Sequence, residues 1–141
     1  MAVRGVIVDN RVFVLGAILR RENDSEKYVY VGQVAFQIDT GSDITILSPM
    51  SLWALNIHPW EIEPARGLVT TLGGVIAPYT LSDFYLWFRD DETGLNMHYL
   101  NKVSVFVRPW EYFNSLLGND VLKEYKISID FSFGDVSLKK Q

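Results

Sequence analysis

The sequence predicts a mostly β fold, a small barrel or sandwich with two short helices. Several runs are rich in β-branched residues, polar or glycine-containing turns separate them, and helix signals occur in only two short segments. The chain has 141 residues, of which 48% are apolar and 21% charged, the balance of an ordinary globular protein. Residues 1–141 are therefore expected to form a single domain.

The first third of the chain is expected to consist of strands. The β-branched runs are residues 3–8, 11–19 and 28–38. The polar stretch 20–27 between the last two runs indicates a long hairpin loop. Near the end of the third run, Val34, Phe36 and Ile38 occupy alternate positions, which predicts one apolar face.

The rest of the chain combines strands with the two helix signals. Ser48 can cap a short helix over residues 48–57, and Pro49 suits its first turn. A second helix is expected near residue 119, with Asn119 or Asp120 as its cap. The further strands are expected in residues 68–88, as two runs around a Gly73-Gly74 hairpin tip, in residues 98–107 and in a closing hairpin over 127–138.

Composition argues against several function classes. The net charge is −4 without a basic stripe, so nucleic acid is not an expected partner. Cysteine is absent, and His58 and His98 lie far apart, so no metal or cofactor is expected. The four tryptophans are expected in the core or at an interface. No apolar run approaches the ~20 residues of a membrane span, and no leader pattern precedes the first strand, so we expect a cytoplasmic protein that binds no membrane.

Asp39 raises the main functional question. It ends an apolar strand and begins the sequence Asp39-Thr40-Gly41-Ser42. Acidic side chains are seldom placed in such surroundings unless they are paired or functional. Gly41 would let the backbone approach the site closely, and the Ser42 hydroxyl can hydrogen-bond the carboxylate and favour its charged form.

Three motifs in this order resemble those of the retropepsin-like aspartic proteases, over roughly residues 10–138. They are the Asp-Thr-Gly-Ser loop, a glycine-containing hairpin, and two apolar residues followed by glycine. The resemblance implies a mostly β fold, the small closed β-barrel of the acid-protease type with one or two short helices. It also implies catalysis by Asp39 and a flap that closes over the substrate. The flap and substrate-binding residues would be Leu72, Gly73, Gly74, Val75 and Ile76, and the apolar-glycine motif would be Leu116, Leu117, Gly118 and Asn119.

The resemblance also gives roles to the neighbours of Asp39. Thr40 would send its hydroxyl to the matching loop of a second half, and Asp43 would contact the substrate backbone or steady the loop. Gly118 would pack closely beneath the loop. Many viral members have arginine where this chain has Asn119, so the bridge from that arginine to the acid matching Asp43 is missing here.

The chemistry requires two aspartates, and one chain supplies one such loop. In this class two close carboxylates share one proton and activate a water for attack on a peptide carbonyl. The segment most similar to a second Asp-Thr-Gly loop is Glu92-Thr93-Gly94. It has glutamate in place of aspartate and no apolar strand before it, so it indicates a turn. We therefore expect a homodimeric endopeptidase acting on extended peptides. The candidate strands for joining the subunits are residues 3–8 and 135–140.

Two other interpretations remain. A non-catalytic dimerisation or peptide-binding module could use the same fold, because fold does not establish activity. The intact Asp39-Thr40-Gly41 favours catalysis over that alternative. An unrelated β-barrel binding a small apolar ligand is disfavoured, because it leaves the acid unexplained.

Overall fold

The computed structural model describes residues 2–22, 25–64, 69–71, 74–76, 79–92, 94–105 and 114–141. The strands are β1 (Val3–Val8), β2 (Arg11–Arg21), β3 (Tyr28–Ile38), β4 (Ile46–Leu47), β5 (Glu63–Pro64), β6 (Val69–Thr71), β7 (Gly74–Ile76), β8 (Tyr79–Asp90), β9 (Gly94–Val105), β10 (Leu116–Leu117), β11 (Tyr125–Asp130) and β12 (Asp135–Lys140). The helices are α1 (Pro49–Ala54), the 3-10 turn η1 (Pro59–Glu61) and α2 (Asn119–Leu122). Within these described ranges, no helix has the length and apolarity needed to cross a bilayer.

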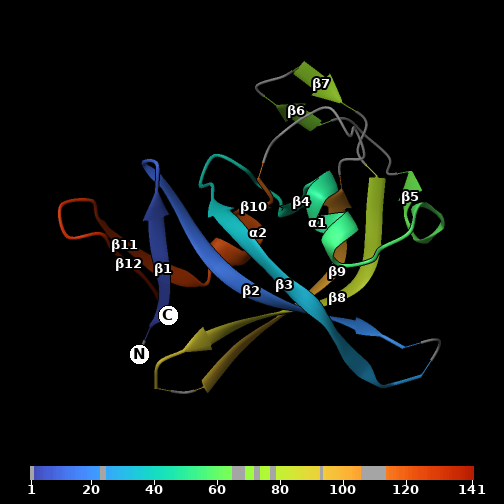
Figure 1. The fold of residues 1–141 in the computed structure, drawn as a ribbon, viewed down its shortest axis with the longest axis horizontal. Coiled ribbons are helices and arrows are strands. Elements are labelled where there is room, and N and C mark those ends of the chain that lie inside the picture. The colour runs from blue at the N-terminus through green and yellow to red at the C-terminus, as the bar shows by residue number, and fades with distance from the viewer. Residues whose placement is uncertain are drawn as a thin grey trace.

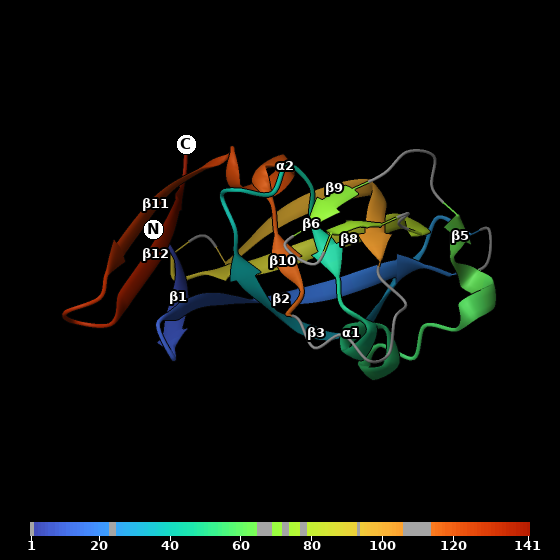
Figure 2. The same cartoon turned by 90° about the horizontal axis from the view of Figure 1, so that it is seen from above.

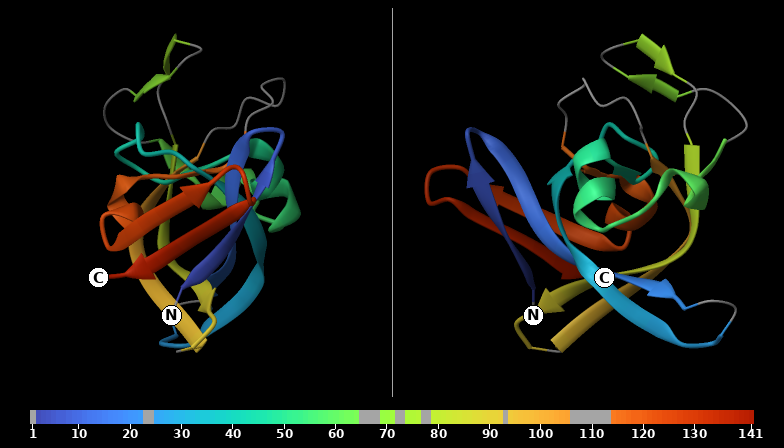
Figure 3. Two further views of the ribbon diagram at one scale, coloured as in Figure 1. Left: turned by 90° about the vertical axis from the view of Figure 1, so that its left-hand side faces the viewer. Right: turned by 45° about the vertical axis from the view of Figure 1, so that its right-hand side comes forward.

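Ten strands form one sheet in the order β11-β12-β1-β2-β3-β10-β4-β9-β8-β5. Strand β8 also pairs with β1 and β2, so the sheet turns back on itself and its strands form a ring (Figure 1). The predicted mostly β fold with short helices is confirmed. Strands β6 and β7 form a second, two-stranded sheet that projects from the ring on the same side as the loop after β3 (Figures 1 and 3).

The N-terminal strands follow the sequence pattern closely. Strands β1 and β3 have the predicted bounds, and β2 extends two residues further, to Arg21. Asp9 and Asn10 join β1 to β2 with φ of 50° and 63°. Positive φ at both central residues is the signature of a type I′ turn, whose twist matches that of the flanking strands.

Both strands proposed for joining subunits already have neighbours within the chain. Strand β1 pairs with β12 through Val3 and Leu138 and with β2 through Val6 and Phe13, and β12 pairs along its whole length with β11. The β11–β12 hairpin lies beside β1 (Figures 1 and 2). The free edge at this end of the ten-stranded sheet is therefore β11, and a role of β1 or β12 in joining subunits stays a prediction.

The interior of the ring is filled by large apolar side chains. The largest fully buried ones are Phe36, Phe84, Phe88, Leu47, Leu81, Leu86, Leu117 and Leu138. Each contributes about 1.5–3 kcal/mol of burial free energy. Trp53 and Trp60 are 83% and 78% exposed, so neither lies in the core, one of the two places expected for the tryptophans. Trp53 belongs to α1 and Trp60 to η1. Helix α1 buries Leu52 and is capped by Ser48 as predicted.

Candidate active site

The acid lies where β3, β4 and β10 meet. Strand β10 lies between β3 and β4, parallel to β3 and antiparallel to β4, so residues 39–45 pass around its end (Figure 2). The parallel ladder continues past the end of β3: Gln37 N donates to Ser115 O at 2.8 Å, and Asp39 N donates to Leu117 O at 3.1 Å. Asp39 therefore keeps strand geometry, and its position is fixed by the backbone of β10.

The Asp39 carboxylate is half-buried and held by its own loop. Gly41 N donates to Asp39 Oδ1 at 3.0 Å, and Ser42 N donates to Asp39 O at 3.2 Å. A Cβ at position 41 would lie 3.2 Å from the same Oδ1. This close approach favours glycine, as the sequence indicated. Thr40 and Gly41 are exposed, so the loop is open to solvent.

Gly118 supports the loop from below. A Cβ at this position would lie 2.3 Å from Ile44 O and 2.4 Å from Ile44 C, which is far inside contact distance. The expected close packing of Gly118 under the loop is therefore observed. Its N–H donates to Thr45 Oγ1 at 3.2 Å. Beyond Gly118, Asn119 N donates to Ser42 O at 2.8 Å and Asp120 N donates to Asp43 O at 3.2 Å.

The N-cap of α2 is Gly118, which makes no side-chain bond, so neither Asn119 nor Asp120 occupies the predicted cap position. Asn119 Nδ2 donates to Thr40 O at 2.8 Å. The Asp120 carboxylate accepts from Thr45 N at 3.0 Å and from Thr45 Oγ1 at 2.7 Å. Its Oδ1 also accepts from Val121 N in the first turn of α2, at 3.0 Å. Both side chains reach across to the acid's loop, because β10 places the start of α2 against it.

The expected hydrogen bond from Ser42 to Asp39 is wrong. Ser42 Oγ donates to Ile44 O at 2.7 Å, and a hydroxyl has only one proton to give. The Ser42 side chain therefore shapes the loop. Asp43 is exposed, and within the described part of the chain its carboxylate has no hydrogen bond or ion pair.

The residues proposed for the flap lie on and beside the β6–β7 hairpin. Thr71 pairs with Gly74, the first residue of β7, so Gly74 belongs to a strand and not to the hairpin tip predicted for it. The backbone of Val75 and Ile76 continues β7. Leu72 and Gly73 lie outside the described residues.

A buried polar cluster anchors the far end of α2. The His98 side chain is 3% exposed, and its Nδ1 lies 2.9 Å from Glu124 Oε2. Its Nε2 lies 2.5 Å from the Tyr125 hydroxyl. Burial lowers the pKa of His98, with the bond to Glu124 acting in the opposite direction. Burial raises the pKa of the Tyr125 hydroxyl, because it disfavours the charged phenolate. His98 is thus a packing residue of the buried cluster.

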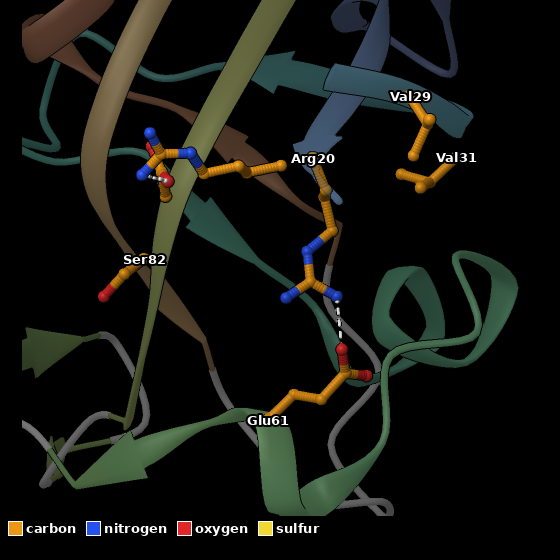
Figure 4. Close-up of a pocket in the computed structure, with 7 residues that line it drawn as sticks. Arg20, Val29, Val31, Glu61 and Ser82 are labelled. Carbon is orange, nitrogen blue, oxygen red and sulfur yellow. Dashed lines mark hydrogen bonds and ion pairs between the residues drawn. The ribbon is translucent and has the colours of Figure 1, made fainter. Parts of the chain in front are cut away.

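A separate pocket contains none of the loop residues. It is lined by two valines, Ser82 and two pairs of opposite charges (Figure 4). Arg20 Nη1 lies 2.6 Å from Glu61 Oε1, and Arg21 Nη1 lies 3.6 Å from Asp83 Oδ2. These charges neutralise each other, so the pocket gives no sign of a charged ligand. The described residues hold no group of three or more metal-ligating side chains either.

Sequence reasoning missed three residues around the acid and gave Asp120 a different role. Thr45 binds Asp120, and Gln37 and Asn114 lie beside the loop. Alternation along β3 could have identified Gln37, since residues two apart share one face of a strand. Asn114 and Asp120 are brought to the loop by the pairing of β10, which no local pattern encodes.

Comparison with known proteins gives a result only at the level of structure. No family model matches the chain, and no curated protein matches it in sequence. A retropepsin-like aspartic protease from Rickettsia conorii superposes with a TM-score of 0.57 at 17% identity, over 98% of this chain and 90% of that one. The EIAV protease, complexed with the inhibitor HBY-793, superposes with a TM-score of 0.52 at 16% identity, over 82% and 88%. The chain therefore has the fold of the retropepsin-like aspartic proteases.

Proposed function

We propose that the chain is an aspartic endopeptidase that works as a homodimer, each subunit giving one Asp39. The observation that carries this proposal is the position of the Asp39 carboxylate. It lies at the end of a strand, open to solvent on one side, with Gly41 N bonded to one oxygen. That arrangement fixes the acid and leaves its other oxygen available for a water or a second carboxylate.

The reaction follows from two such carboxylates at a two-fold axis. Close like charges do not both ionise, so the pair shares one proton. The ionised carboxylate takes a proton from water as the oxygen attacks the peptide carbonyl, and the protonated one hydrogen-bonds the carbonyl oxygen. Proton transfer to the leaving nitrogen then accompanies cleavage of the C–N bond. The exposed Thr40 supports the dimer, because it leaves the loop accessible to the matching loop of a second subunit.

The β6–β7 hairpin is the proposed flap. Gly74, Val75 and Ile76 would place backbone groups over an extended peptide. Closure by such a hairpin excludes water and orients the substrate.

Asp39→Asn tests the catalytic role, with Asp9→Asn as the control, because Asp9 is an exposed acid in the turn between β1 and β2. Hydrolysis of a denatured protein should fall at least about a hundredfold in Asp39→Asn and stay close to wild type in Asp9→Asn. Sedimentation and circular dichroism check that both variants keep fold and assembly. Wild-type hydrolysis by Asp39→Asn would end the proposal.

Subunit mixing tests the dimer. Specific activity should fall on dilution, and excess Asp39→Asn subunits should inhibit the wild type by forming heterodimers with one acid. A monomer with full activity, or indifference to the added subunits, would contradict the shared site.

A further inference from the structure

The face of the sheet beside Asp39 carries a pair of amides. Asn114 Nδ2 donates to Gln37 Oε1 at 3.1 Å. Gln37 precedes Asp39 by two residues in a ladder that continues through both, so their side chains leave the same face. The spacing along the strand is about 6.6 Å. Both amides are half-buried, whereas the neighbouring Phe36 points into the core.

Apolar side chains flank this amide pair. Phe13 pairs with Gln37 across β2 and β3, and Leu116 pairs with Gln37 across β3 and β10. Phe13 and Leu116 are half-buried, and each alternates with fully buried neighbours along its own strand, which places it on the outer face. The surface next to the acid is therefore apolar except for one amide pair.

The pair retains unused hydrogen-bonding capacity. Gln37 Nε2 still has both N–H groups, and Asn114 Oδ1 is an acceptor; neither has another partner among the described residues. A donor and an acceptor side by side match a primary amide, which presents the same two groups in reverse. A carboxylate only accepts, an ammonium only donates, and an alkyl group would cover both groups without satisfying them.

We propose that Gln37 and Asn114 determine substrate specificity, selecting peptides with asparagine or glutamine within two residues of the cleaved bond. The proposal rests on the endopeptidase function proposed above. An extended peptide advances about 3.3 Å per residue, so a side chain this close to the bond reaches the pair. In a two-fold dimer each subunit contributes one pair, so the preference occurs on both sides of the bond.

The test is cleavage-site profiling of the full chain on a peptide library made from a digested proteome. Wild type should favour asparagine and glutamine over leucine about tenfold at a flanking position, the effect of about one net hydrogen bond. Gln37→Leu and Asn114→Leu should each remove this preference while cleavage continues. Gln33→Leu is the matched control, because Gln33 lies on the same face of β3, exposed and about 20 Å from Asp39.

The outcomes separate this inference from the proposed function. Cleavage with an apolar preference that Gln37→Leu does not change overturns the amide selection and leaves the endopeptidase intact. If wild type cuts no peptide, the endopeptidase proposal fails. The preference for amide side chains is then measured as peptide binding. For that measurement, wild type and Gln37→Leu are applied to arrays of peptide pairs that differ only in glutamine or leucine. Equal binding of the two members by wild type overturns the inference.

Discussion

Two segments near the candidate site are built in opposite ways. Six hydrogen bonds join residues 40–45 to residues 118–120, and three of them use side chains of Thr45 and Asp120. The β6–β7 hairpin forms a two-stranded sheet of its own, in which each strand pairs with the other. An isolated two-stranded hairpin is only marginally stable in water, so the hairpin depends on its own pairing while the loop is held from several directions.

The difference matches what each segment has to do under the proposed function. A catalytic carboxylate must stay within a fraction of an ångström of its working position, which calls for a braced loop. A flap must open and close, which calls for few bonds to the ring. Substitutions in the loop should therefore cost stability and activity together, whereas substitutions in the hairpin should cost activity alone.

Gly118→Ala should give the largest effect. The new Cβ would meet the backbone of Ile44 at 2.3 Å, and backbone cannot rotate away as a side chain can. We expect a loss of about 3 kcal/mol of unfolding free energy, together with most of the activity. Urea unfolding measures the first effect and peptide hydrolysis the second.

Gly94→Ala is the control for this change. Gly94 has φ of 91°, and a Cβ added there would have no atom within 4 Å. The variant therefore tests backbone strain without a clash, at a cost of about 1 kcal/mol. Equal losses in the two variants would show that Gly118 is not specially packed.

Asp120→Ala should come second. It leaves Thr45 N without its acceptor in a partly buried site, at a cost of about 1–3 kcal/mol. Asp130→Ala is the matched control, because Asp130 accepts from Ser132 N and Phe133 N in an exposed turn where water can replace it. If the urea midpoint shifted equally in both variants, Asp120 would contribute no more to stability than an exposed turn residue, and it would not brace the loop.

Gly74→Val tests the hairpin. Turnover should fall about tenfold, because a side chain is added where the backbone would approach the peptide. The unfolding free energy should stay within about 0.5 kcal/mol of wild type, as for other substitutions outside the core. A lower melting temperature with unchanged turnover would show that the hairpin is structural, and it would contradict the contrast drawn between the hairpin and the loop.

Acidification should lower the free energy of unfolding through His98, which contacts Glu124 and Tyr125 just after α2. Its pKa is lower in the folded protein than the ordinary value of 6.5, mainly because it is buried. The unfolded chain therefore takes up the proton first, and stability falls as the pH drops below about 6.5, by at most about 1.4 kcal/mol per pH unit. His98→Gln should show a shallower slope between pH 7.5 and 5.5 in urea unfolding. A steeper or equal slope would exclude His98 as the cause.

Ser42→Ala should have the smallest effect on activity. It removes one bond to Ile44 O, worth about 0.5–1.5 kcal/mol, and leaves the bonds of Asp39 in place. The pH–rate profile of kcat/KM should keep both limbs where they are. A shift of either limb in Ser42→Ala would indicate that Ser42 hydrogen-bonds Asp39 directly, against the structure.

Local patterns were sufficient for much of this fold and for the acid itself. Strands β1 and β3 and the cap of α1 depend on neighbouring residues, and the alternation in Val34 and Phe36 marks the buried face. The partners of Ser42, Asn119 and Asp120 could not be predicted in the same way. Their partners Ile44, Thr40 and Thr45 lie in the loop, and for Asn119 and Asp120 they are more than 70 residues away in sequence, so the contacts depend on how β10 and the start of α2 lie against the loop.

The insertion of β10 between β3 and β4 also has a consequence for how the protein is made. Leu116 and Gln37 are 79 residues apart in sequence, yet they are neighbours in a parallel ladder. Pairings over such separations close large loops and form slowly. During synthesis the segment 39–45 emerges long before residues 114–120, and until these arrive it lacks the bond from Asp39 N to Leu117 O and the bonds to residues 118–120. The nascent chain therefore carries the acid without the strand that fixes its position, and under the proposed function it acquires cutting ability late, once β10 is in place.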